Sequence, residues 1–256
     1  MSTLVPTGGR GFGVDIGGSG IKGAPVDLAT GEFTDERRRI PTPEPSTPKA
    51  VAEVVAQIVE SFGTASGDLP VGVTFPAVIQ HGIARTAANV SSMWVDADVD
   101  ALITTRLGRS VHVVNDADAA GFAEAHYGAA KGVKGVVVVA TLGTGIGSAL
   151  FVDGILVPNT ELGHLEIDGY DAETRAADSA REREGLSWEK WARRLQRYFG
   201  VLEALFWPDL IVVGGGVSRK HDRFLPLLEL RTPIVPAALR NDAGIIGAAL
   251  LAAELG

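Results

Sequence analysis

The stretch that decides the fold is Gly13-Val-Asp-Ile-Gly-Gly-Ser-Gly-Ile-Lys22, in which one carboxylate precedes a cluster of glycines. Glycines let backbone N–H groups approach a ligand closely, and successive N–H groups form a concavity that binds anions. Because Asp15 would repel a bare phosphate, the stretch fits a phosphate ligand only if a cation or its water shell lies between them. It therefore indicates metal-assisted phosphate chemistry.

A second glycine loop has a similar context. The apolar run 135–141 is typical of a central strand that is buried on both faces, and it ends in Leu142-Gly-Thr-Gly-Ile-Gly147. A hairpin is expected after each of the two glycine loops. The order strand, glycine loop, hairpin begins at Phe12 and again at Val136, which predicts a duplicated unit.

The composition excludes several classes of protein. The 256 residues are 46% hydrophobic, enough for one large or two modest domains. The absence of cysteine excludes disulfides, thiolate zinc sites and cysteine nucleophiles. No apolar run approaches the ~18 residues of a membrane helix and Met1 to Arg10 lacks a secretory pattern, so we expect a cytoplasmic protein. A formal net charge of −8 disfavours nucleic acid and membrane partners, so any polyanion must bind at a local patch.

The rest of the chain alternates between strand-like and helix-like patterns. Helices are expected at 49–62, 117–127, 187–206 and 243–255, and strands at 71–75, 111–114, 210–213 and 233–235. This alternation predicts two α/β domains, with ligands beyond the carboxyl ends of the strands. The smaller domain covers 10–115 and is completed by the helix 243–255, and the larger domain covers 116–242.

The segment Gly18–Gly23 satisfies the dinucleotide-binding pattern G-x-G-x-x-G, but that pattern requires a helix directly after it, and a hairpin is expected here. The sequence also lacks a P-loop. One glycine loop alone indicates a tight turn, whereas three loops at the ends of three apolar strands favour binding of a phosphate chain. The candidate donor-binding residues in these loops are Gly17, Gly18, Ser19, Gly20, Thr141, Gly143, Thr144, Gly145, Gly214, Gly215 and Gly216.

Five motifs carry a resemblance to a known family. They are V-D-I-G-G-S-G-I-K, Asn115-Asp116, T-L-G-T-G-I-G, Glu161-Leu-Gly-His164 and V-V-G-G-G-V-S. In this order they resemble the ROK family of sugar kinases over about residues 10 to 255. The resemblance implies the two-domain actin/hexokinase-type (ribonuclease H-like) α/β fold with a cleft between the domains. It also implies phosphoryl transfer to a sugar hydroxyl, a requirement for Mg²⁺, and a homodimer.

One departure from the family pattern points to a particular branch of the family. Typical members carry a cysteine-rich structural zinc element soon after the glycine-histidine pair, and this chain has no cysteine, so no structural zinc is expected. The replacement segment 169–183 looks like the branch that phosphorylates glucose from inorganic polyphosphate, as do Thr74-Phe-Pro, 85–89 and 239–244. The resemblance implies transfer from polyphosphate and ATP to the 6-hydroxyl of glucose, with mannose as a second acceptor.

Asp116 is the candidate general base, because the end of a strand fixes an exposed carboxylate there. From the residues alone a helix cap formed by Asn115-Asp116 is an equal alternative, and the resemblance favours catalysis. The resemblance also implies that Asp15 holds Mg²⁺ through water. We interpret Lys22 as a solvated strand residue rather than a phosphate contact. The sugar contacts implied by the resemblance are Asn89, Asn115, Asp116, Glu161, His164 and Glu173.

The helix expected at 187–206 has an apolar face and a basic face. Lys190, Arg193, Arg194 and Arg197 form the basic stripe, and three further arginines lie just upstream in an otherwise acidic chain. We predict that this stripe contacts polyphosphate, the alternative being an ordinary solvated face. The aromatic residues of this helix belong either to the core or to a subunit interface: they include Trp188, Trp191 and Tyr198.

Two other functions are alternatives to a polyphosphate-dependent sugar kinase. One is an ATP-only hexose or N-acylmannosamine kinase of the same family. The other is a non-catalytic sugar-sensing regulator or binding module. Regulators of the family carry a DNA-binding region ahead of the first glycine loop, whereas about fourteen residues precede Asp15 here. A binding module would be expected to lack Asp116 or the glycine loops, and this chain has them.

Overall fold

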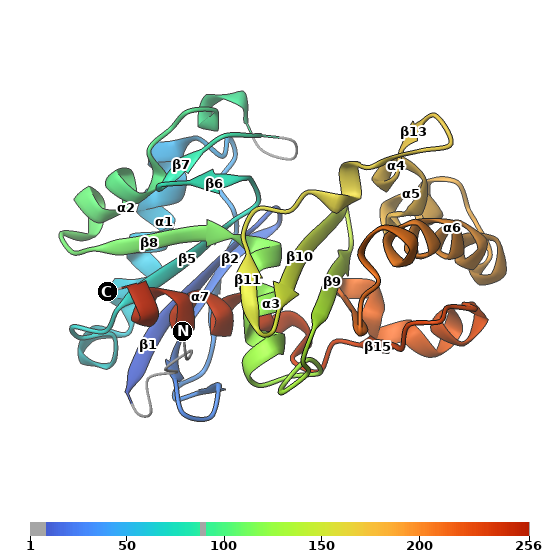
Figure 1. The fold of residues 1–256 in the computed structure, drawn as a ribbon. Helices are drawn as coiled ribbons and strands as arrows, with labels where there is room; N and C mark the ends of the chain where they lie inside the picture. The colour runs from blue at the N-terminus through green and yellow to red at the C-terminus, as the bar shows by residue number, and fades with distance from the viewer. Residues whose placement is uncertain (1–8, 88–90, 256) are drawn as a thin grey trace. The chain divides into compact units, whose positions relative to one another are not determined.

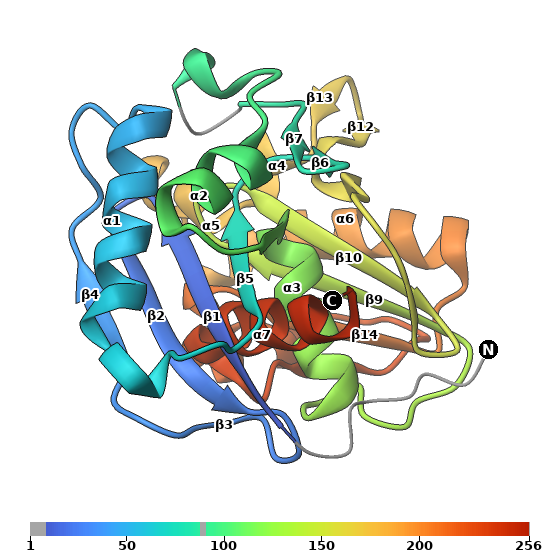
Figure 2. The same cartoon turned by 90° about the vertical axis from the view of Figure 1, so that its left-hand side faces the viewer.

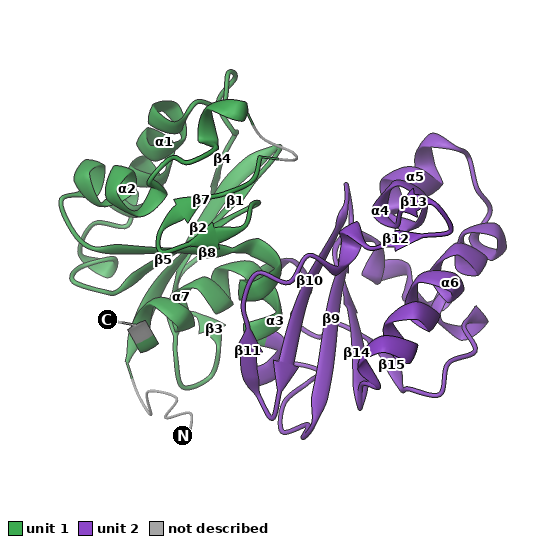
Figure 3. Ribbon diagram, turned by 45° about the horizontal axis from the view of Figure 1, so that its top comes forward, with its two compact units in different colours: residues 1–123, 242–256 green, residues 124–241 purple. Residues whose placement is uncertain are grey.

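The computed structural model describes residues 9–87 and 91–255, which divide into two compact units (Figures 1 and 3). Unit 1 comprises residues 1–123 and 242–256, and unit 2 comprises residues 124–241. We expected the boundary after residue 115, but it falls within helix α3 (Asp116–His126). The start of α3 packs tightly on helix α7 (Ala243–Leu255), since a methyl group on Gly247 would lie 1.8 Å from the Ala119 carbonyl oxygen.

The sheet of unit 1 has the strand order β3-β2-β1-β5-β8, with β4 also paired to β2. Its strands are β1 (Arg10–Gly17), β2 (Gly20–Asp27), β3 (Glu32–Phe33), β4 (Arg38–Ile40), β5 (Val71–Phe75) and β8 (Val111–Asn115). β1 is antiparallel to β2, while β1, β5 and β8 are parallel to one another. The carboxyl ends of β1, β5 and β8 therefore lie along one edge of the sheet.

Alternation along β1 assigns its residues to two faces of the sheet. Phe12 and Val14 are fully buried in the cluster that includes helix α1 (Pro48–Ser61). On the other face, a methyl group on Gly13 would lie 1.9 Å from the Ile245 carbonyl oxygen of α7. Figure 2 shows α7 lying across β1 and β5, which it contacts. The missing side chain thus permits direct contact between helix and strand backbones.

Local signals account for the helices of unit 1. Thr47 caps α1 by accepting a hydrogen bond from the Ala50 N–H at 3.3 Å, with Pro48 at the first helical position. Helix α2 (Val99–Leu107) begins at Asp98, which accepts from the Ala101 N–H at 2.8 Å, and ends at Gly108 with φ +69°. The short hairpin of β6 (Ile79–Gln80) and β7 (Ile83–Ala84) completes this unit.

Unit 2 is built on a five-stranded sheet of order β11-β10-β9-β14-β15. Its strands are β9 (Val136–Leu142), β10 (Ile146–Val152), β11 (Ile155–Val157), β14 (Leu210–Gly214) and β15 (Ile234–Pro236). β9 is the central strand, as the valine run predicts. β10 is antiparallel to β9, whereas β14 is parallel to it, so the end of β9 and the end of β14 lie side by side.

Helix α6 (Trp188–Phe206) packs against this sheet (Figure 1). Ser187 caps it through the Lys190 N–H at 3.4 Å. Trp191 and Tyr198 are fully buried and Trp188 is partly buried in the same hydrophobic cluster, so these three aromatic residues belong to the core of unit 2. The smaller elements here are β12 (Glu166–Ile167), β13 (Tyr170–Asp171), α4 (Glu173–Ala176) and α5 (Asp178–Arg183).

A buried carboxylate holds the beginning and the end of unit 2 together. Glu124, 1% exposed, accepts hydrogen bonds from the N–H groups of Ala129 at 2.7 Å, Ala238 at 3.1 Å and Leu239 at 2.7 Å. Among the helices formed by residues 9–87 and 91–255, none is long and apolar enough to cross a membrane.

Candidate active site

Asp15 lies on β1 at the carboxyl edge of the unit 1 sheet. Its Oδ1 accepts a hydrogen bond from the Thr74 hydroxyl at 2.9 Å, and its Oδ2 lies 3.5 Å from Lys22 Nζ. Lys22 stands directly opposite Asp15 in the β1–β2 register, so it is an ion-pair partner and not the solvated strand residue that we expected. The carboxylate is a hard oxygen donor of the kind that Mg²⁺ prefers, and its neighbours leave it 22% exposed.

The first glycine loop is the tight turn of the β1–β2 hairpin, and the predicted hairpin follows it as the antiparallel pair of β2 and β3. Thr42 donates to the Gly17 carbonyl at 2.5 Å, and Arg39 Nη2 donates to the Ser19 carbonyl at 2.6 Å. A methyl group on Gly20 would lie 2.5 Å from Arg39 Nε. Arg39 thus brings a guanidinium to this loop, which the sequence pattern alone did not indicate.

Asn115 and Asp116 lie where β8 passes into α3. The Asn115 side chain is buried: its Oδ1 accepts from the N–H groups of Ala117 at 2.9 Å and Asp118 at 3.0 Å, and its Nδ2 donates to the Ala77 carbonyl at 3.0 Å. Asn115 is therefore a helix cap, and within the part of the chain that the structure describes one of its two amide hydrogens has a partner, which leaves the other for a ligand. Asp116 Oδ1 accepts from the Ala117 N–H at 2.8 Å.

The other two glycine loops lie together in unit 2. Gly214 pairs with Thr141 in the parallel register of β14 and β9. Gly215 has φ +81°, and a methyl group there would lie 2.2 Å from the Leu142 carbonyl oxygen. Ser179 at α5 holds the 143–145 loop, because its N–H donates to the Gly143 carbonyl at 3.0 Å and its hydroxyl to the Thr144 carbonyl at 2.6 Å.

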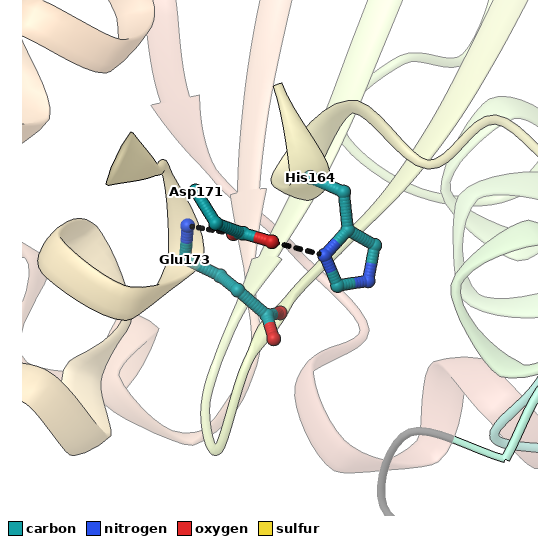
Figure 4. Close-up of side chains that lie close together, drawn as sticks. All are labelled: His164, Asp171 and Glu173. Atoms are coloured by element: carbon teal, nitrogen blue, oxygen red, sulfur yellow. Dashed lines mark hydrogen bonds and ion pairs between the residues drawn. The ribbon is translucent and has the colours of Figure 1, made fainter. Parts of the chain in front are cut away.

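His164 lies in a group of carboxylates (Figure 4). Its Nδ1 is 2.8 Å from Asp171 Oδ2, and its Nε2 is 3.9 Å from Glu161 Oε2. The hydrogen bond with Asp171 raises the pKa of His164, with smaller contributions from the charges of Glu173, Asp171 and Glu161. Burial raises the pKa of Glu161, and the charge of Glu173 adds to this effect. The group can bind a neutral polyhydroxyl ligand through both donors and acceptors.

Glu173 connects this group to the second glycine loop. Its Oε2 accepts a hydrogen bond from the Ile146 N–H at 3.0 Å, directly after Gly145. A methyl group on Gly145 would lie 2.3 Å from the same oxygen. The structure therefore brings the predicted sugar-binding residues of unit 2 next to one predicted phosphate-binding loop.

A basic cavity of about 420 Å³ lies beside α6 in unit 2. Arg197 forms a bidentate ion pair with Asp168 at 2.9 and 2.7 Å, and Arg194 pairs with Glu184 at 2.6 Å. Within the part of the chain that the structure describes, Lys190 and Arg193 form no ion pair. Half of the predicted basic stripe is thus neutralised. The polar and aromatic residues that line the cavity are Lys190, Arg193, Arg194 and Arg197 of the stripe, together with Asp168, Arg175, Tyr170 and Tyr198.

One predicted residue cannot be placed in the site, and one residue of the site was not predicted. Asn89 lies outside the described residues. Asp171 also belongs to the group around His164, which the sequence did not predict. Its Oδ1 accepts from the Glu173 N–H at 3.1 Å, two residues along the chain, in a local turn of the kind that aspartate favours, but its contact with His164 has no local signature.

The fold and the paired glycine loops are those of an α/β phosphotransferase, and comparison with known proteins gives its family. The ROK family model matches residues 11–178, and the chain belongs to the ROK family. It is similar to the polyphosphate glucokinase of Mycobacterium tuberculosis (strain ATCC 25618 / H37Rv), with 52% identity over 242 residues, 94% of this chain and 90% of that protein.

Solved structures agree with this assignment. The inorganic polyphosphate/ATP-glucomannokinase of Arthrobacter sp. strain KM is 59% identical with a TM-score of 0.93, covering 96% of this chain and 99% of that chain. The ROK family glucokinase of Streptomyces griseus, solved with glucose and AMPPNP, is 22% identical with a TM-score of 0.81, covering 96% of this chain and 100% of that chain. The fold is thus the two-domain actin/hexokinase-like fold of ROK sugar kinases, as predicted.

Proposed function

We infer that the protein is a kinase that transfers a phosphoryl group from inorganic polyphosphate to glucose. Identities of 52% and 59% to proteins named for polyphosphate-dependent sugar phosphorylation support this activity. The observation within the structure that carries it is the contact of Glu173 with Ile146, which joins a sugar-binding group to a phosphate-binding loop. An ATP-only kinase and a non-catalytic regulator are the alternatives that the experiments below separate.

We propose that Asp116 is the general base and accepts the proton of the sugar 6-hydroxyl as the oxygen attacks the terminal phosphorus of the donor, whose bond to the shortened polyphosphate breaks. Its hydrogen bond with the Ala117 N–H fixes the carboxylate at the start of α3, where the helix dipole stabilises a negative charge. The proposed sugar contacts are Asn89, Asn115, Asp116, Glu161, His164 and Glu173. Asn115 would contribute its remaining amide hydrogen.

The kinase relatives imply a divalent metal, which we propose is Mg²⁺ held through water by Asp15. The carboxylate oxygens of Asp15 are ligands of the kind that Mg²⁺ prefers, and Lys22 and Thr74 fix the orientation of this carboxylate. When bound, Mg²⁺ would screen the charge of the donor phosphates. The proposed donor contacts in the chain are Gly17 to Gly20, Thr141, Gly143, Thr144, Gly145 and Gly214 to Gly216.

We propose that polyphosphate also occupies the basic cavity beside α6. Among residues 9–87 and 91–255, Lys190, Arg193 and Arg175 line it without carboxylate partners, so three positive charges face a volume of about 420 Å³ in an acidic protein. Arg175 lies 3.8 Å above the Tyr170 ring, which fixes its guanidinium. Arg194 and Arg197 would bind less strongly, because Glu184 and Asp168 already neutralise them.

The proposal extends to further partners and to the assembly. We propose ATP as a second donor and mannose as a second acceptor, both of which appear in the name of the Arthrobacter enzyme as an ATP-glucomannokinase. Mannose differs from glucose at one ring carbon and offers the same 6-hydroxyl. We further propose that the protein acts as a cytoplasmic homodimer.

The first test is formation of glucose 6-phosphate by the purified protein with Mg²⁺, with nucleotide-free long-chain polyphosphate or ATP as sole donor. Product from polyphosphate supports the proposal. Product from ATP alone makes the protein an ATP-only kinase. No product from either donor, with mannose also tested, supports the non-catalytic regulator.

A second test addresses the basic cavity. The double variant Lys190→Ala/Arg193→Ala should raise the KM for long-chain polyphosphate at least about tenfold and leave the KM for ATP unchanged, because two charge-assisted contacts are lost. Lys131→Ala/Lys134→Ala removes the same charge from an exposed segment of unit 2 and serves as the control. Equal effects of the two double variants would contradict a specific role for the cavity.

A further inference from the structure

Asp171 lies between two of the proposed sugar contacts and touches both (Figure 4). Its Oδ2 is 2.8 Å from His164 Nδ1, and its Oδ1 accepts the Glu173 N–H at 3.1 Å. We propose that Asp171 is a positioning residue for sugar binding, which fixes the hydrogen on His164 Nδ1 and the backbone that carries Glu173. This inference rests on the proposed function, since it assumes that His164 and Glu173 bind the sugar.

The contact with His164 selects one tautomer. An ionised carboxylate only accepts hydrogen bonds, so at 2.8 Å Nδ1 carries the hydrogen and Nε2 of a neutral ring is left as an acceptor. Nε2 lies 3.9 Å from Glu161 Oε2, beyond hydrogen-bond distance. The neutral ring therefore accepts a hydrogen bond from a sugar hydroxyl at Nε2. Without Asp171 the ring would populate both tautomers and rotate about its side-chain bonds.

The charge state of the ring depends on the same contact. Among the described residues, the charged groups that face His164 are Asp171, Glu161 and Glu173, and all three favour its protonated form. A protonated ring donates from Nε2, and a sugar hydroxyl can accept that bond as readily as it donates one. Asp171 thus keeps Nε2 usable in both charge states, with Nδ1–H bound to the same oxygen.

The second oxygen of Asp171 holds Glu173 through the backbone. The Thr174 hydroxyl donates to the Asp171 carbonyl at 2.7 Å, which fixes the same turn from the other side. Glu173 then reaches Ile146 with Oε2. Loss of the Asp171 carboxylate would free the backbone N–H of Glu173, whereas the hydrogen bond between the Glu173 side chain and the Ile146 N–H would remain.

Exposure argues for a role in binding rather than in folding. The side chains of His164 and Asp171 are 42% and 38% exposed. Exposed ion pairs contribute little to stability, so removal of the carboxylate should affect the site more than the fold. The same exposure leaves the pair accessible to a small polar ligand.

The test uses Asp171→Asn, which keeps the shape of the side chain, with Asp222→Asn on an exposed segment of unit 2 as the matched control. In ¹⁵N-edited NMR spectra, wild-type His164 should titrate above the ordinary imidazole range with hydrogen on Nδ1. In Asp171→Asn the titration should move to lower pH and the two ring nitrogens should become more alike. His164→Gln identifies the signals that belong to this ring.

Kinetics give the second readout. Asp171→Asn should raise the KM for glucose about tenfold, as expected for one charge-assisted hydrogen bond, with the KM for polyphosphate and kcat within about threefold of wild type. Asp222→Asn should match wild type. An unchanged His164 titration, or an unchanged glucose KM, would overturn the proposal. If His164→Gln leaves the glucose KM unchanged while the NMR signature responds to Asp171→Asn, the sugar assignment fails although the geometry is correct.

Discussion

Glu173 Oε2 accepts a hydrogen bond from the Ile146 N–H at 3.0 Å, and this bond joins the residues around His164 to the loop that ends β9. The carboxylate also covers Gly145, where a methyl group would lie 2.3 Å from the same oxygen. A side chain assigned to the sugar therefore also determines the conformation of a loop assigned to the donor. The kinetic consequence is that variants of Glu173 should affect both substrates.

Glu173→Gln should raise the KM for glucose and the KM for the phosphoryl donor, each by about tenfold, because an amide nitrogen can replace the acceptor that faces the Ile146 N–H. His164→Gln should raise only the KM for glucose. Steady-state kinetics with each substrate varied in turn measures both effects. A donor KM that stays at the wild-type value in Glu173→Gln would show that the loop keeps its conformation without this bond.

Asp116→Asn should reduce kcat by about 10²–10⁴-fold and leave glucose binding largely intact, since the amide keeps the shape of the side chain but cannot accept the proton. Glucose binding is measured by isothermal titration calorimetry without donor, and kcat by glucose 6-phosphate formation. Asp35→Asn, at an exposed position in unit 1, is the control. A near-normal rate in Asp116→Asn would assign the base to another residue.

Gly13→Ala should lower the free energy of unfolding by about 3 kcal/mol, because the new methyl group would lie 1.9 Å from the Ile245 carbonyl oxygen and α7 would have to move. The same substitution at Gly200, within α6, should raise it by about 0.5–1 kcal/mol, since nothing lies within 4 Å and alanine favours the helix. Chemical denaturation followed by circular dichroism compares the two. Changes of the same sign would contradict the packing argument.

Glu124→Gln should destabilise the protein by about 2–3 kcal/mol. Three backbone N–H groups donate to this buried carboxylate, and the amide replaces one acceptor oxygen by a donor. Glu229→Gln, at an exposed position in unit 2, should change the midpoint of thermal unfolding little. Equal midpoints for the two variants would mean that the three hydrogen bonds contribute nothing measurable.

The ion pair between Arg106 and Glu53 should give a pH-dependent contribution to stability. The hydrogen bond from Arg106 lowers the pKa of Glu53 to about 2 from an ordinary value of 4.5. A lowered pKa of Glu53 stabilises the folded state at pH values above the ordinary pKa of 4.5. This contribution to stability is lost as the pH falls from 4.5 toward 2. Glu53→Gln should therefore melt a few degrees below wild type at about pH 7, and the difference should narrow by about pH 3. A difference that stays constant over this range would contradict the link to ionisation.

The sequence predicts the elements whose signals are local. Thr47 and Pro48 place the start of α1, and the apolar run 243–255 coincides with α7. The glycine loops and Asn115-Asp116 also stand at the ends of strands, as expected. Each of these features depends on residues a few positions apart, or on a motif that a family shares.

What the sequence could not predict depends on contacts between distant segments. Lys22 pairs with Asp15 only because the β1–β2 turn sets them opposite each other. Asp171 reaches His164 through a short hairpin that has no strong strand pattern, and Glu184 and Asp168 neutralise half of the basic stripe from outside α6. Charge counts along a helix take no account of such partners.

Glu124 is the first residue of unit 2, and its carboxylate holds Ala238 and Leu239 just before the last one, Asn241. The two ends of unit 2 are therefore hydrogen-bonded to each other, and unit 2 is an insertion in the sequence of unit 1. Insertions with adjoining ends are the kind that chains tolerate, because the host continues across a short gap. Residues 124–241 thus form one continuous insertion whose two ends are tied to each other by a single buried carboxylate.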